Sequence, residues 1–272
     1  MKKLLFSSLM LIIAFSACKK DDDSSNNVTP TPTGVVITSS DLGSAGDSML
    51  MNVDTTNLTG FSLGVPGQNV TWDFSTLGVD RIDTNAFLAP ANTPGGTYFA
   101  SSNLAMEVST NPSIYMYLSK TTDKVEGLGM WANVYGNEGH AEYSDKPIMM
   151  KFPMQYNSAF IDSGALSLIT SYQQTYIKIE MKQTIDSKVD ASGTLKLPNN
   201  ASYSCIREKR TEINNQNIYM SSSQFGPWMP YQSNADTSYT YCFYAKNQKW
   251  DVCDVSVKDF TTNTINSISY KK

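Results

Sequence analysis

The sequence contains a single histidine, His140, in 272 residues. Serine and cysteine nucleophiles are usually activated by a histidine base, so an enzyme of either kind would depend on this one residue. Glu138, His140 and Glu142 would share one face of a strand, which suits a metal site of one imidazole and two carboxylates. Three adjacent ligands on a flat strand converge poorly, however, and Gly139 suggests a turn. A solvated, charged hairpin is the simpler interpretation, and we predict no catalytic residue, metal or cofactor.

Arginine is almost as scarce, because the chain has only Arg81, Arg207 and Arg210, and the formal net charge is −4. Nucleic-acid-binding proteins cluster lysine and arginine to neutralise phosphates. The sequence has no such basic patch, so nucleic acid is not an expected partner. The acidic residues are scattered and lack the spacing of a calcium-binding loop, and ordinary turns account for the aspartates that lie close together. These are Asp41, Asp47, Asp54, Asp80 and Asp83.

Long apolar runs are absent after the first residues of the chain. Leu4 to Phe15 is apolar except for Ser7 and Ser8, and it follows Lys2 and Lys3. A membrane-spanning helix needs about 20 apolar residues, so this run is too short. The order of positive charge, apolar run and small residues is typical of a secretory signal peptide. We therefore assign residues 1–17 to a signal peptide, and an ordinary signal with an incidental Cys18 is the alternative.

The residues Phe15-Ser16-Ala17-Cys18 resemble the lipobox of bacterial lipoproteins, with Phe15 where leucine is commoner. In that class the cysteine becomes the mature N-terminus and carries acyl chains, and two or more chains give stable anchoring. The resemblance implies that Cys18 is the lipid attachment site and that a membrane is a partner.

The charged run directly after Cys18, Lys19-Lys20-Asp21-Asp22-Asp23, is similar to the export tag of Bacteroidota surface lipoproteins. This resemblance implies an outer-membrane lipoprotein that faces the cell exterior. The inward-facing leaflet, with the charges as the mere start of a solvated linker, is the alternative. Residues 18–34 continue with Ser, Asn and Thr-Pro repeats, which favour an extended, flexible tether.

Residues 35–272 contain no second linker, and we expect them to form a single all-β domain. In residues 176–182, Ile177, Ile179 and Met181 alternate with polar residues or tyrosine, as in a strand with one wet face. Only residues 99–106 suggest a short helix. Such close succession of strands favours antiparallel sheets, hence a β-sandwich or a curved half-barrel with few or no helices. Further strands are expected at residues 114–118, 194–197, 217–220, 239–244 and 250–257.

The β domain also resembles a group of exported Bacteroidota proteins without an assigned activity. Val70-Thr-Trp72-Asp-Phe74-Ser matches their "tWDFS" signature, and Phe152-Pro153 with Tyr156 and Ser158 matches a second element. A third element, Asp190 to Pro198 with Gly193-Thr-Leu195, is followed by Tyr203 and Arg207. Relatives often carry a further sorting domain; here we expect the lipid anchor to provide retention. The resemblance implies location and fold but no chemistry.

Three cysteines lie in the expected β domain, Cys205, Cys242 and Cys253. An exported protein can keep disulfides, but three cysteines form at most one intramolecular pair. A hairpin folded between Asn247 and Gln248 would place Cys242 opposite Cys253, so a disulfide between them is possible. Two free thiols packed in the core are the alternative.

The strongest ligand signal is the segment from Gln224 to Tyr231, which contains Phe225, Trp228, Tyr231 and two prolines between expected strands. Prolines stiffen a loop, and a stiff loop can present aromatic side chains to a sugar or peptide at low entropic cost. The alternative is that these aromatics fold back as a lid over the core.

These features favour a non-catalytic binding or adhesion module on the cell surface, with a glycan or an envelope protein as its ligand. The first alternative is a structural or accessory envelope protein that works through protein partners, which includes a curved sheet that holds a lipid. The second alternative is a polysaccharide or peptide hydrolase, which would need paired carboxylates across a cleft.

Overall fold

The computed structural model describes residues 34–272 except residues 57, 111, 112, 135 and 173. The signal peptide, Cys18 and all of the tether before residue 34 lie outside the described residues.

Fourteen strands account for most of the described chain. They are β1 (Ser48–Asp54), β2 (Gly67–Asp73), β3 (Arg81–Leu88), β4 (Leu104–Thr110), β5 (Ser113–Lys120), β6 (Lys124–Val134), β7 (Asn137–Asp145), β8 (Ile148–Lys151), β9 (Ala159–Tyr172), β10 (Thr175–Lys196), β11 (Ser202–Ser221), β12 (Met229–Ala245), β13 (Asp251–Val257) and β14 (Ile265–Lys271). The helices of the described part are two single 3₁₀ turns, Ser39–Asp41 and Pro90–Asn92. No helix in the described residues has the length and hydropathy needed to cross a membrane.

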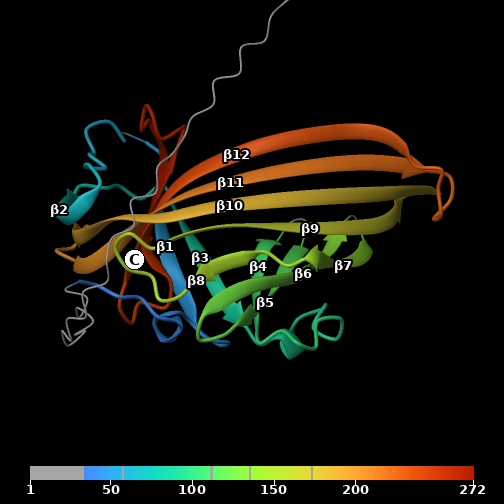
Figure 1. Ribbon diagram of the computed structural model, residues 1–272, viewed down its shortest axis with the longest axis horizontal. Helices are drawn as coiled ribbons and strands as arrows, with labels where there is room; N and C mark the ends of the chain where they lie inside the picture. The colour runs from blue at the N-terminus through green and yellow to red at the C-terminus, as the bar shows by residue number, and fades with distance from the viewer. Residues whose placement is uncertain (1–33, 57, 111–112, 135, 173) are drawn as a thin grey trace, which may run out of the picture. The chain divides into compact units, whose positions relative to one another are not determined.

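Twelve of the strands form one antiparallel sheet that closes on itself. The order is β11-β12-β13-β14-β1-β3-β4-β5-β6-β7-β9-β10, and β10 pairs again with β11. Figure 1 shows β9, β10, β11 and β12 as long, curved neighbours. The all-β, antiparallel expectation is confirmed, but a sandwich or half-barrel is wrong. The reason is that β10 uses both of its edges, one for β9 and one for β11, so the sheet becomes a closed barrel.

The alternation that the sequence shows at residues 176–182 belongs to a much longer strand. Residues 175–196 form the single strand β10, which also contains residues 194–196 of the separate strand expected at 194–197. The short helix suggested at residues 99–106 is wrong. The amide of Ser102 donates to the carbonyl of Phe99 in a turn, and β4 begins two residues later.

The closed sheet buries side chains on both of its faces. The inner face forms one core, to which five strands contribute: β4, β5, β6, β11 and β12. Examples, in the same order, are Leu104, Leu118, Val125, Ile206 and Tyr244. Outside, the segment that contains β2 covers β10 to β14, and its Trp72 and Phe74 pack edge-on against Phe243. Both faces are therefore apolar where they are covered, which explains why several strands do not alternate cleanly.

A buried ion pair holds the outer cover in place. The guanidinium of Arg207 donates to both carboxylate oxygens of Asp190, from Nε at 2.8 Å and from Nη2 at 3.0 Å, and Nη1 donates to the carbonyl of Leu63. The guanidinium also lies over the ring of Tyr241, 4.7 Å from its centroid. Asp190 and Arg207 are thus structural, because they tie β10 and β11 to the segment that precedes β2.

Gly193 lies where β2 joins β10 in parallel, opposite Val70. An ideal Cβ on Gly193 would lie 1.8 Å from the carbonyl oxygen of Val70. Gly193→Ala should therefore push β2 off the sheet and lower the free energy of unfolding by about 1–3 kcal/mol. Urea denaturation measures this, with Gly34→Ala as the control, since nothing lies within 4 Å of a Cβ there. Equal stability of the two variants would contradict the pairing.

Candidate functional site

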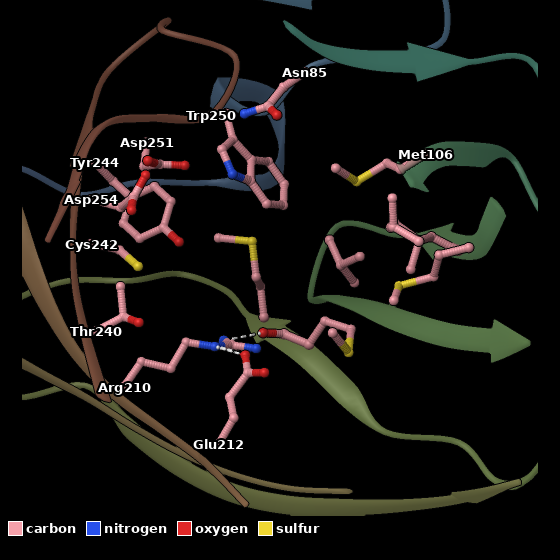
Figure 2. A pocket seen from close by; sticks show the side chains of 16 residues that line it. Asn85, Met106, Arg210, Glu212, Thr240, Cys242, Tyr244, Trp250, Asp251 and Asp254 are labelled. Atoms are coloured by element: carbon pink, nitrogen blue, oxygen red, sulfur yellow. Dashed lines mark hydrogen bonds and ion pairs between the residues drawn. The ribbon is translucent and has the colours of Figure 1, made fainter. Parts of the chain in front are cut away.

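The interior of the closed sheet contains a cavity of about 320 Å³. One wall is apolar and rich in methionine, and the facing wall carries polar and charged groups (Figure 2). Val108 is half exposed and lines the same cavity, so it marks an opening to solvent. The apolar wall comes mainly from β4, β5, β6 and β8 and consists of Met106, Met116, Leu118, Val125, Met149 and Met150.

The alternation of β11 builds the first part of the polar wall. In Glu208-Lys-Arg210-Thr-Glu212 four of the five residues are charged, and Glu208, Arg210 and Glu212 share the inward face of the strand, since Arg210 and Glu212 line the cavity. The Nε of Arg210 donates to Glu212 Oε1 at 2.5 Å, and its Nη1 donates to the carbonyl of Met149 at 2.8 Å. Figure 2 shows these contacts as dashed lines. The two carboxylates around Arg210 raise the pKa of the guanidinium, although burial opposes this.

Glu208 is fully buried but well supplied with partners. The hydroxyl of Ser187 donates to one of its carboxylate oxygens, and the hydroxyl of Tyr244 donates to the other at 3.3 Å. Nη1 of Arg210 lies 3.7 Å from Glu208 Oε1. The buried Glu208 and the partly buried Glu212 are therefore both compensated by one guanidinium and by hydrogen bonds.

A β-bulge in β13 supplies the second part of the polar wall. Phe243 pairs with Cys253, but the next residue, Tyr244, pairs with Asp251, so β13 has one extra residue. Val252 and Cys253 consequently both pack into the outer core, while Asp251 and Asp254 both line the cavity. Without the bulge, residues three apart would lie on opposite faces of the strand.

Asp251 and Asp254 differ from the two glutamates because no positively charged side chain compensates the two aspartates among the groups that act on them. Asp251 is buried, and its Oδ2 has no hydrogen-bond partner among the described residues. Burial, followed by the charge of Asp254, raises the pKa of Asp251 well above its usual range. Burial also raises the pKa of Asp254 to about 6, although a hydrogen bond from the Ser269 side chain opposes this shift. Such a pair in a cavity is a functional-site signal.

The aromatic segment that the sequence singles out lies elsewhere, in the loop between β11 and β12 and, from Met229 to Tyr231, in the first residues of β12. Phe225 is 92% exposed and Tyr231 is 63% exposed, so these two do not form a lid over the core. Trp228 is partly buried, and the ammonium of Lys178 lies 5.5 Å from the centroid of its ring. The three residues are close in sequence but do not line the cavity.

The disulfide considered between Cys242 and Cys253 does not form. All three cysteines of the described domain are free and buried. The bulge shifts the hairpin by one residue, so that Cys242 faces Asp254, and Cys253 faces Phe243. Cys242 then points into the interior core while Cys253 joins the outer core, and burial raises the pKa of both thiols well above the usual range.

His140 lies on β7 and takes no part in the cavity lining. Its ring stacks on Tyr98 with a centroid separation of 3.7 Å, and its strand neighbour is Trp131. Glu138 and Glu142 are exposed. Among the described residues, no group of three histidine, cysteine, aspartate or glutamate side chains is placed to hold a metal ion.

Sequence reasoning missed the residues that define this cavity, but signals for them exist. Asp251 and Asp254 interrupt an otherwise apolar strand, Asp-Val-Cys-Asp-Val-Ser-Val, where an acid on the core side is unexpected. The charged residues Glu208, Arg210 and Glu212 are spaced two apart, which places both signs of charge on one strand face. Neither pattern shows by itself that the two faces meet across one cavity.

Comparison with protein-family models, curated proteins and solved structures finds no match to this chain. The cavity is the strongest functional feature of the described residues, because it combines an apolar wall with two poorly compensated carboxyl groups.

Asp254→Asn should raise the free energy of unfolding at pH 7.5, by about 1–3 kcal/mol. The pKa of Asp254 is about 6 in the folded chain against an ordinary 3.8. Between these values the folded chain binds more protons than the unfolded chain, so this carboxyl destabilises the fold as the pH rises. The gain of the variant should therefore shrink as the pH falls towards 4.

Urea denaturation between pH 4 and 8 measures this difference. Asp236→Asn is the matched control, because Asp236 is an exposed aspartate on the neighbouring strand β12. A variant Asp254→Asn that is no more stable than the wild type at pH 7.5 would refute the destabilising role of this carboxyl.

Proposed function

We propose that this protein is an exported, lipid-anchored, non-catalytic binding protein that takes a small, largely apolar ligand into the cavity of its closed sheet. The observation that carries the proposal is the cavity of about 320 Å³ with its methionine-rich wall. Sites for small molecules usually have volumes of about 300–1,000 Å³, mostly apolar linings and a few polar groups that fix orientation.

The composition of the apolar wall supports a binding role. Methionine side chains are unbranched and polarisable, so they adapt to ligands of different shape. Met106, Met116, Met149 and Met150 come from three different strands and meet at one cavity. A core that served only stability would favour tight packing of leucine, isoleucine and valine over an open space.

A non-catalytic role agrees with the state of the polar groups. Arg210, Glu208 and Glu212 are held in mutual contacts, and the single histidine stacks on Tyr98 away from the cavity lining. We place no reacting group in the cavity, and its polar wall serves to orient a ligand.

We further propose that the protein is held at the outer membrane through acyl chains on Cys18, with the β domain facing the cell exterior. Two or more acyl chains give stable anchoring. Feeding cells a labelled fatty acid tests this: the wild-type protein should carry the label, and Cys18→Ala should lose it and leave the membrane fraction. Label retained by Cys18→Ala would refute the anchor.

Binding of the uncharged fluorophore N-phenyl-1-naphthylamine tests the cavity. The full chain with Cys18→Ala is used, so that no detergent is needed. We expect saturable binding with enhanced fluorescence, because the fluorophore leaves water for the methionine wall. Met116→Trp, which fills the cavity, should weaken binding at least about tenfold, which corresponds to about 1.4 kcal/mol.

Met229→Trp is the control variant for this experiment, because Met229 is exposed on β12 and lies outside the cavity. It should bind the fluorophore as the wild type does. Equal affinity of the Met116→Trp variant and the wild type would place the site elsewhere, and absence of saturable binding to the wild type would refute an accessible cavity.

The exposed loop supports a second candidate, namely docking of a glycan or an envelope protein at the surface. Phe225, Met229 and Tyr231 are large apolar side chains exposed within seven residues of chain, an arrangement typical of interaction surfaces. Beyond Tyr239, towards the loop, β12 pairs only with β11 among the described strands, which leaves one backbone edge free. Capture of surface glycans that Trp228→Ala abolishes, with the fluorophore still bound, would favour this candidate.

A further inference from the structure

We propose that the cavity selects ligands that carry a protonated amine on an apolar body, with Asp251 and Asp254 as the groups that bind the ammonium. The inference rests on the proposed function, since it names the chemical class of ligand for that same cavity. It follows from the distribution of charge in the cavity, from one unpartnered buried oxygen and from the aromatic side chains beside it.

The interior holds more acidic than basic side chains. Glu208, Glu212, Asp251 and Asp254 face it, and Arg210 is the guanidinium among them. Arg210 already contacts both glutamates, at 3.7 Å from Glu208 and at 2.5 Å from Glu212. The charges that act on the two aspartates from other strands are those of Glu208 and Asp83, which are acidic as well. A cation is the ligand group that this field favours.

The unpartnered oxygen shows where the cation would bind. Oδ2 of Asp251 is buried and accepts no hydrogen bond in the described structure, although Asp251 lines the cavity. An unsatisfied buried polar atom is costly and calls for an explanation. An ammonium group has three donors, which suffice for Asp251 Oδ2 and for the carboxylate of Asp254. The charged hydrogen bonds formed in this way are about twice as strong as neutral ones.

The surroundings of the aspartates suit an organic cation better than a metal ion. Trp250 and Tyr244 lie beside Asp251 in Figure 2, and aromatic rings attract ammonium groups. The opposite wall offers the methylene groups of Met106 and Met116 rather than oxygen atoms. Calcium requires six to eight oxygen ligands, whereas an alkylamine places its charge at the aspartates and its chain on the methionines.

Three probes of equal length test the inference: octylamine, octanol and octanoate, which carry a positive, a neutral and a negative head group. Each is titrated against the full chain with Cys18→Ala at pH 7.5 and measured by displacement of N-phenyl-1-naphthylamine. We expect octylamine to bind about tenfold more tightly than octanol, and octanoate to bind most weakly. Octanol that binds as tightly as octylamine would overturn the inference while leaving the apolar site intact.

Variants identify the groups responsible. Asp251→Asn and Asp254→Asn should each reduce the preference for octylamine over octanol at least about threefold, with octanol affinity unchanged. Asp236→Asn, an exposed aspartate that does not line the cavity, should keep the full preference. A preference for octylamine that survives both cavity substitutions would refute the role of the two aspartates. If a variant does not fold, the wild-type preference for octylamine over octanol and its pH dependence still test the inference.

The pH dependence gives a readout that needs no variant. Octylamine, like the lysine side chain with its pKa of about 10.4, stays protonated from pH 8 to pH 5. Asp254, whose pKa is about 6, gains a proton over this range, so octylamine binding should weaken as the pH falls while octanol binding stays constant. The charged or titratable groups that face the pair are Glu208, Arg210 and Glu212 of β11, Cys242 and Tyr244 of β12, and Asp83 of β3.

Four outcomes are therefore distinguishable. Failure of the fluorophore and of all three probes to bind would refute the proposed function and the inference together. Equal binding of octanol and octylamine, or octylamine binding that does not weaken towards pH 5, would refute the inference alone. Selective binding of octylamine that requires Asp251 and Asp254 would establish it.

Discussion

The pairing of β10 with β11 closes the sheet and thereby creates its interior. The two strands stay in register from Tyr176 opposite Ser221 to Lys196 opposite Ser202, with a single bulge. Because β10 also pairs with β9 and β2 along its other edge, the sheet closes and gains an inside and an outside. A closed sheet has few free edges, and its inner face must either be filled by side chains or enclose a cavity. In this protein the segment around Trp72 covers part of the outer face, and the inner face encloses the cavity.

Two bulges decide which side of the closed sheet receives the charged residues. In β10 the register shifts between Val189 and Ala191, so Val189 packs inside while Ala191 packs outside, and Asp190 pairs with Arg207 beneath the outer cover. In β13 the extra residue Val252 brings Asp251 to the same side as Asp254. The bulge in β10 thus places Asp190 beneath the outer cover, and the bulge in β13 places Asp251 and Asp254 at the cavity. One inserted residue changes the chemistry of a whole strand face.

The sequence predicts the class of fold but not its closure, and the reason is physical. Alternation at Ile177, Ile179 and Met181 predicts a strand, and the strand is confirmed, but burial does not alternate over residues 175–181, which are all partly buried. Closure depends on which strand edges meet, and β1 pairs with β14 over more than two hundred residues of chain, which local patterns do not encode. The cysteine hairpin shows the same limit, because the expected pairing of Cys242 with Cys253 fails by one residue at the bulge. The aromatic loop is recognisable from its local composition. The cavity is not, because its lining residues come from many separate strands.

The contrast between the two kinds of acid inside the sheet points to a role in binding. Glu208 and Glu212 show that this interior can satisfy buried carboxylates, since Ser187, Tyr244 and Arg210 supply the required partners. Asp251 lies on the next strand but one and lacks a partner at Oδ2. A fold selected for stability alone would have no use for such a group, because an uncompensated carboxyl in an apolar site weakens the folded state. The penalty is removed when a ligand provides the missing positive charge, so the same two aspartates that strain the empty protein would stabilise the occupied one.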